Sequence, residues 1–209
     1  MECFADRTAA ARAAATALAD ALRARLAAEA RAAIAVSGGT TPAETFGLLA
    51  AEDLAWDRVQ VTLTDERRVP VDDPASNEGM LRRTLLTGRA AAAEFVALEA
   101  GTLAALPDSF AAVLVGMGED GHFASLFPDL PDLAARLDPD AAEPCHEVRT
   151  AASPHPRTTL SFARLLASNV VVLLAFGEAK RAVLEAPGER PVAALLEQTR
   201  TPVRVLWAA

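Results

Sequence analysis

Apolar positions near the N-terminus recur at helical spacing. Leu18, Leu22 and Leu26 lie four residues apart in an alanine-rich segment, and most of its charged residues fall off that stripe. Because residues four apart share one face of a helix, the spacing predicts a long amphipathic helix over residues 5–33.

Short, continuously apolar runs follow, and most end in a charged or glycine-rich stretch. Strands of this kind are buried on both faces, which is typical of a mainly parallel sheet covered by helices. The predicted strands are residues 33–36, 59–64, 95–98, 111–115, 158–162, 170–176 and 203–207, with another near residue 148. The later predicted helices are residues 42–51, 77–86, 178–185 and 192–197.

We therefore predict an α/β fold with a single open, doubly wound, mainly parallel sheet and helices on both faces. The chain shows no internal repeat, low-complexity linker or break in composition, so residues 1–209 are expected to form one domain. The stretch 128–144, rich in proline and aspartate, is interpreted as a long excursion near a site.

Composition narrows the choice of partners. The chain has 209 residues, 52% of them hydrophobic, which is enough to bury a full core without a disulfide or a metal. A net charge of −8 argues against a nucleic-acid partner, because nucleic acids are bound through an excess of lysine and arginine. A small anion bound at a local basic site remains compatible with this charge.

The sequence carries neither a membrane signal nor a metal signal. No apolar run approaches the roughly 20 residues that span a bilayer, and the N-terminus does not read as a secretory signal. The two cysteines lack the spacing of metal ligands. We expect a cytoplasmic protein without a structural metal site, as a monomer or a weak homodimer.

Three unusual loops follow predicted strands: residues 37–41, 65–68 and 116–122. In open α/β sheets the ligand crevice lies beyond the carboxyl ends of the strands. These loops therefore contain the candidate site residues.

The first loop has the parts of an anion cradle. Gly38 and Gly39 permit close approach of the backbone, Thr40 offers a hydroxyl, and the helix that begins at Pro42 offers free N–H groups. The same residues also suit an ordinary strand-to-helix turn. Since no Walker lysine follows, nucleoside triphosphate hydrolysis is not indicated.

The third loop presents a histidine. Its glycines match the dinucleotide-binding spacing, but Glu119 and Asp120 would place two carboxylates against a pyrophosphate, so that interpretation is rejected. His122 suits a general base near neutral pH, and Asp120 could orient it. A purely structural histidine is the alternative. His146 and His155 are interpreted as surface or supporting residues.

Cations complete the candidate site. Asp65 and Arg67 belong to a charged loop that would, taken alone, be a self-neutralising surface loop. Beside the cradle and the histidine, the guanidinium can grip a phosphate at two points. Lys180 is the only lysine in the chain, and every other basic residue is arginine.

These motifs, in this order, resemble the 6-phosphogluconolactonase family. The strings that carry the resemblance are Ser-Gly-Gly-Thr-Thr-Pro at 37–42, Thr-Asp-Glu-Arg-Arg-Val-Pro at 64–70 with Ser76 and Asn77, Gly-x-Gly-x-Asp-Gly-His-x-Ala-Ser-Leu-Phe-Pro at 116–128, Pro-Arg-Thr-Thr-Leu-Ser at 156–161 and Gly-Glu-Ala-Lys-Arg at 177–181. The resemblance implies a fold like those of glucosamine-6-phosphate deaminase and ribose-5-phosphate isomerase.

The resemblance also implies an activity: hydrolysis of 6-phospho-D-glucono-1,5-lactone to 6-phospho-D-gluconate without a metal or cofactor. His122 would then be the catalytic base on water, with Asp120 beside it. The substrate- and phosphate-binding positions would be Gly38, Gly39, Thr40, Asp65, Arg67, Asn77, Arg157 and Lys180. Which of the three cations meets the phosphate stays open.

Two other functions are compatible with parts of this pattern. A glucosamine-6-phosphate deaminase-like isomerase shares the Asp-Gly-His loop, but in that family the loop continues into a segment resembling Ala-Phe-Asn-Glu-Pro, where residues 124–128 read Ala-Ser-Leu-Phe-Pro. A non-catalytic phosphosugar-sensing domain would carry an attached helix-turn-helix, which this sequence does not supply.

Overall fold

A seven-stranded sheet forms the centre of the computed structural model, which describes residues 1–39 and 41–209. Its strands, in spatial order, are β1 (Glu2–Cys3), β10 (Val203–Ala208), β9 (Val171–Phe176), β6 (Ala112–Val115), β2 (Ala32–Val36), β3 (Val59–Leu63) and β5 (Glu94–Phe95). All neighbouring strands of this sheet run parallel. The prediction of a mainly parallel α/β sheet is therefore confirmed.

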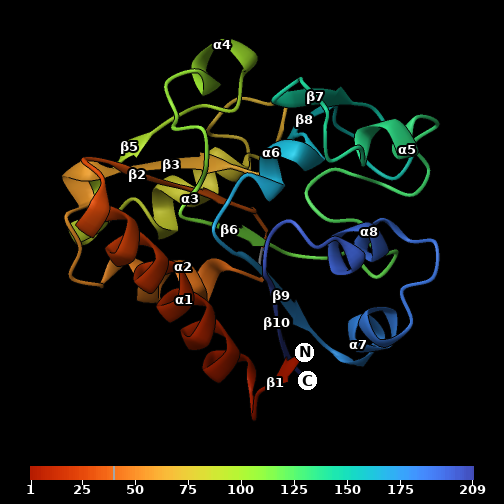
Figure 1. The fold of residues 1–209 in the computed structure, drawn as a ribbon, viewed down its shortest axis with the longest axis horizontal. Helices are drawn as coiled ribbons and strands as arrows, with labels where there is room; N and C mark the ends of the chain where they lie inside the picture. Colours follow the sequence, from red (N-terminus) through yellow and green to blue (C-terminus); the bar gives the residue numbers. More distant parts are fainter. Residues whose placement is uncertain (40) are drawn as a thin grey trace.

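Helices cover both faces of the sheet. The helices are α1 (Arg7–Ala28), α2 (Ala43–Ala50), α3 (Asn77–Thr84), α4 (Ala100–Leu103), α5 (Leu133–Arg136), α6 (Phe162–Leu166), α7 (Glu178–Glu185) and α8 (Pro191–Glu197), with short 3₁₀ turns at Trp56–Arg58 and Gly88–Ala92. Figure 1 shows α7 and α8 on the opposite side of β9 and β10 from α1. The two termini lie close together because β1 pairs with β10.

The alanine-rich character of α1 explains how it packs. Its buried face includes Ala10, Ala14, Leu18 and Leu22, and it contacts β2, β6, β9 and β10. Small side chains let the helix backbone approach the sheet closely, while each fully buried leucine contributes about 1.5–3 kcal/mol. The helix is shorter than predicted. It begins after Asp6, whose carboxylate accepts a 2.7 Å hydrogen bond from Ala9 N, and it ends before β2.

A second, antiparallel sheet was not predicted. It consists of β4 (Asp65–Arg67), β8 (Arg157–Leu160) and β7 (Cys145–Val148), with β8 in the middle. The prediction that residues 65–68 form a charged loop was wrong for residues 65–67. This strand is too short and too charged to show an apolar pattern, and the strand with which it pairs lies about ninety residues further along the chain.

The chain order of the main sheet locates the crevice. From β2 the chain continues to β3 on one side, whereas from β6 it continues to β9 on the other. Such a divergence between two adjacent parallel strands leaves a hollow beyond their carboxyl ends. None of the described helices is long and apolar enough to cross a membrane.

Candidate active site

A cavity of about 160 Å³ lies at the carboxyl ends of β2 and β6. It brings together most of the residues singled out from the sequence: Gly38, Asp65, Arg67, Asn77, His122, Arg157 and Lys180. Ser37, Thr41, Gly116, Met117, Gly118 and Ala124 complete its wall. The crevice therefore lies at the switch point that the strand order defines.

His122 projects from the loop that follows β6. Its Nδ1 lies 2.6 Å from Oδ1 of Asp120, and the side chains are 27% and 40% exposed, respectively. The loop is closed by a 2.9 Å hydrogen bond from Gly118 N to the His122 carbonyl oxygen. A Cβ atom at Gly118 would overlap both the imidazole and the Asp120 carboxylate, so only glycine lets the pair lie over this backbone.

The glycine turn after β2 is shaped by a neighbouring asparagine. A Cβ atom at Gly38 would overlap the side chain of Asn77, whose Nδ2 donates a 2.7 Å hydrogen bond to the Asp65 carbonyl oxygen. Gly39 has a φ of 98°, a conformation that favours glycine. It does not belong to the cavity wall, and the predicted role of Thr40 lies outside the described residues.

Asp65 holds Arg157 in place from inside the protein. Its Oδ2 accepts a 2.6 Å hydrogen bond from Ser125 Oγ and forms a 3.2 Å ion pair with the Arg157 guanidinium. Arg157 also donates through Nε to Ser153 Oγ at 2.9 Å. Burial lowers the pKa of Arg157, and the charge of Asp65 opposes that effect. The carboxylate is thus positioned to orient a cation rather than to meet a phosphate.

Arg67 is aligned with Arg157 across the small sheet, because β4 and β8 pair these two residues directly. Its guanidinium donates a 2.7 Å hydrogen bond to the Ala75 carbonyl oxygen, while its buried Nε has no hydrogen-bond partner among the described residues. A buried N–H group without an acceptor costs about 1–3 kcal/mol. Arg67 is therefore suited to an anion that enters the cavity.

Lys180 approaches the cavity from α7. Burial lowers the pKa of its ammonium group, and the nearby Glu119 carboxylate opposes this shift. No hydrogen bond or ion pair joins the Lys180 ammonium to another described side chain. The cavity wall thus carries three cationic side chains against one buried carboxylate, which makes it suitable for an anionic ligand.

Two site residues were missed by the sequence reasoning. Ser125 is fully buried beneath Asp65, and Phe127 stacks against the His122 ring with 4.2 Å between ring centroids. Both belong to the Asp-Gly-His string, which is the signal that could have identified them. Their roles depend on contacts that sequence proximity does not reveal.

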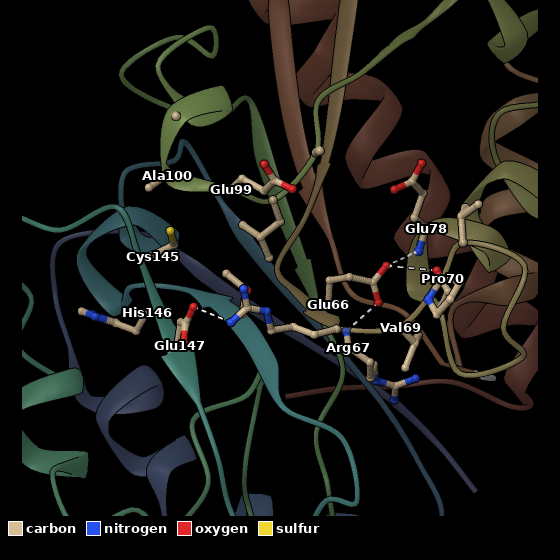
Figure 2. A pocket seen from close by; sticks show the side chains of 17 residues that line it. Glu66, Arg67, Val69, Pro70, Glu78, Glu99, Ala100, Cys145, His146 and Glu147 are labelled. Atoms are coloured by element: carbon tan, nitrogen blue, oxygen red, sulfur yellow. Dashed lines mark hydrogen bonds and ion pairs between the residues drawn. The ribbon is translucent and has the colours of Figure 1, made fainter.

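A second, larger hollow of about 780 Å³ lies on the other side of β4, against β7 and α4 (Figure 2). Among the described residues of its wall, Arg67 is the one that sequence reasoning assigned to the site. Figure 2 shows the Glu66 carboxylate beside the start of α3, where it accepts hydrogen bonds from Asn77 N at 2.8 Å and Glu78 N at 2.6 Å. The candidate chemistry therefore belongs to the smaller cavity, and Glu66 caps a helix.

Taken together, the fold and the smaller cavity define an α/β protein whose candidate site combines three cationic side chains, a glycine turn and a histidine–aspartate pair. The chain belongs to the glucosamine-6-phosphate isomerase/6-phosphogluconolactonase family, whose model matches residues 5–207. It is 43% identical to a 6-phosphogluconolactonase of Caulobacter vibrioides, over 100% of this chain and 97% of the relative. It is 41% identical to a 6-phosphogluconolactonase of Mesorhizobium japonicum, over 98% and 93% of the two chains.

Solved structures show the same architecture. A 6-phosphogluconolactonase from Shewanella baltica superposes with a TM-score of 0.94 at 34% identity, covering 100% of this chain and 97% of that one. A monomeric glucosamine-6-phosphate deaminase superposes with a TM-score of 0.75 at 18% identity, over 100% and 97% of the two chains. At that identity the second likeness concerns the fold alone.

Proposed function

We propose that this protein hydrolyses 6-phospho-D-glucono-1,5-lactone to 6-phospho-D-gluconate, the second step of the oxidative pentose phosphate pathway. The observation that carries the proposal is the shared cavity of His122 with Arg67, Arg157 and Lys180. Full-length similarity to proteins named 6-phosphogluconolactonase supports it.

The histidine geometry suits a general base. Because Nδ1 is engaged by Asp120, the ring hydrogen is assigned to Nδ1 and the lone pair to Nε2. Water would attack the lactone carbonyl carbon C1 as Nε2 of His122 takes its proton. Collapse of the tetrahedral intermediate would then break the bond from C1 to the ring oxygen O5, which leaves as a hydroxyl after receiving that proton.

The cations suit the remote phosphate. Arg67 and Lys180 are proposed to bind the phosphate directly, because neither the Arg67 Nε nor the Lys180 ammonium has a hydrogen-bond partner among the residues that the structure describes. Arg157, already held by Asp65 and Ser153, is proposed to keep a fixed charge beside it. Gripping the phosphate at one end of the substrate positions C1 at the other, which is how a non-reacting group contributes to rate.

A rapid assay of freshly generated lactone tests the proposal, since the lactone also opens spontaneously. We expect clear acceleration over the spontaneous rate, unchanged by EDTA, because the mechanism uses no metal. His122→Ala should lower kcat by about 10²–10⁴-fold while 6-phosphogluconate still binds. Equal rates with and without enzyme would refute the proposal, and retained turnover in His122→Ala would assign the base elsewhere.

The deaminase alternative is tested on the same preparation. Release of ammonia from glucosamine 6-phosphate would favour it, whereas residues 124–128 lack the segment that the deaminase family carries. A cytoplasmic, single-domain monomer or weak homodimer is proposed as the working form, and light scattering over a concentration series measures its assembly state.

A further inference from the structure

The aromatic ring beneath the histidine is buried and tightly placed. Phe127 is only 3% exposed. Its ring stacks on the His122 imidazole, with 4.2 Å between the ring centroids and 29° between the ring planes. The Arg157 guanidinium lies 5.3 Å from the centroid of the same ring. One side chain therefore contacts both the histidine and a cation of the cavity.

A tight turn brings Phe127 back under His122. Leu126 N donates a 3.0 Å hydrogen bond to the Phe123 carbonyl oxygen, and Ala124 adopts a φ of 49°. A left-handed conformation costs a residue other than glycine roughly 1–2 kcal/mol. Such strain persists where the surrounding structure holds it in place, and it is often found at functional sites.

The two contacts on the imidazole restrict different motions. The hydrogen bond to Asp120 holds the ring at one edge atom, Nδ1, and it holds the ring only while that single contact persists. The Phe127 ring packed against the face of the imidazole opposes tilting of the ring plane, and such tilting would carry Nδ1 away from Asp120. The edge contact and the face contact together hold the direction in which Nε2 points.

We propose that Phe127 is a positioning residue that orients His122, so that Nε2 is directed into the cavity. The inference rests on the proposed function, because it concerns the base of that reaction. It assigns to Phe127 no contact with the substrate. Its effect should therefore appear in kcat and in the state of the imidazole, rather than in binding of the phosphate.

The decisive variant is Phe127→Leu, which keeps an apolar side chain but removes the flat ring. We expect kcat to fall on the order of 10- to 100-fold, because small misplacements of a reacting group cost that much. Affinity for 6-phosphogluconate should change less than about threefold. Phe127→Tyr, which retains the ring, should recover most of kcat.

A matched control is Phe110→Leu. Phe110 is fully buried and lies under an arginine as well, with Arg164 at 4.3 Å, but it precedes β6 at the other end of the strand. Both leucine variants lose a buried ring, so a general loss of packing should affect both. Equal kcat in the two variants would overturn the proposal.

Nuclear magnetic resonance of ¹⁵N-histidine gives a readout independent of activity. The chain has only three histidines, and His122→Ala identifies the relevant signals. The wild-type ring should show one fixed tautomer with hydrogen on Nδ1, whereas Phe127→Leu should show averaging between tautomers. Unchanged His122 signals in a folded Phe127→Leu protein would overturn the proposal, even if kcat fell.

The two hypotheses fail differently. If wild-type protein does not hydrolyse the lactone, the proposed function fails, while the histidine signals still decide whether Phe127 orients the ring. If Phe127→Leu does not fold, Phe127→Met is measured instead, because methionine adapts to irregular space without providing a flat face. An unperturbed tautomer in that variant counts equally against the proposal.

Discussion

Nδ1 of His122 lies 2.6 Å from Oδ1 of Asp120, two residues earlier in the same loop. The same carboxylate oxygen also accepts a 3.2 Å hydrogen bond from the His122 backbone N–H. One carboxylate oxygen therefore restrains both the backbone turn and the Nδ1 edge of the ring. It leaves Nε2 as the nitrogen that can exchange protons in the cavity.

The Asp120 contact predicts the effect of Asp120→Asn. The asparagine amide can donate to Nδ1, which favours the tautomer with hydrogen on Nε2 and removes the lone pair from the cavity. We expect kcat to fall on the order of 10²-fold or more, with little change in affinity for 6-phosphogluconate. Steady-state kinetics and calorimetry measure the two quantities. A variant with normal kcat would show that the tautomer does not matter.

Lys180 predicts a dependence of product binding on pH. Burial lowers the pKa of its ammonium, so the positive charge is lost at lower pH than in an exposed lysine. A sugar phosphate, whose second pKa is about 6, stays doubly charged above neutral pH. Affinity for 6-phosphogluconate should therefore weaken as pH rises through the pKa of Lys180, by about tenfold once the ammonium is deprotonated and one charged hydrogen bond is lost.

Lys180→Arg is the matched variant, because a guanidinium stays charged throughout that range. Isothermal titration calorimetry at several pH values should show that the affinity of this variant for 6-phosphogluconate does not change with pH. If the affinity of the wild-type protein and of Lys180→Arg changes with pH in the same way, Lys180 does not hold the phosphate.

Ser125→Ala tests the buried support of Arg157. The variant removes the hydrogen bond from Ser125 Oγ to Oδ2 of the buried Asp65. Among the described residues, Arg157 then remains as the partner of this oxygen, at 3.2 Å. The free energy of unfolding should fall by about 1–3 kcal/mol, and KM should rise as Arg157 loosens. Ser109→Ala is the control, since Ser109 Oγ accepts a hydrogen bond from Arg25 without supporting a buried carboxylate. Urea unfolding measures the free energy of unfolding of both variants, and an equal loss in the two would contradict the prediction.

Gly38→Ala and Gly47→Ala should have opposite effects. A Cβ atom at Gly38 overlaps Asn77, so the variant should raise KM and lower stability, with typical costs of about 1–3 kcal/mol for overpacking. Gly47 lies in α2 with open space around the added atom, so its substitution should stabilise the protein by up to about 1 kcal/mol. Thermal unfolding measures both. When Asn77 is already replaced by alanine, Gly38→Ala should lower the stability less. If the loss of stability is undiminished, the added Cβ atom clashes with a residue other than Asn77.

Much of the fold could be predicted because strong local patterns specify it. Continuously apolar strands are buried on both faces of the sheet. The predicted helix start at Asn77 also agrees with α3, because the hydroxyl of the preceding residue, Ser76, caps the helix by accepting a hydrogen bond from Gly79 N. The small antiparallel sheet could not be predicted. Its three-residue strand at Asp65–Arg67 has no periodic pattern, and it forms only because β8 supplies a partner.

The sequence by itself determined the parallel α/β architecture, the ends of strands at which a site could lie, and the residue types available there. Those properties depend on periodicity and on local chemistry, which neighbouring residues carry. Tertiary structure alone decided that Ser125 supports Asp65, that Arg67 lies opposite Arg157, and that Phe127 stacks on His122. Such contacts depend on how turns and strands meet in space, and a hydrogen bond or a stacked ring is sensitive to differences of less than an ångström that no sequence spacing specifies.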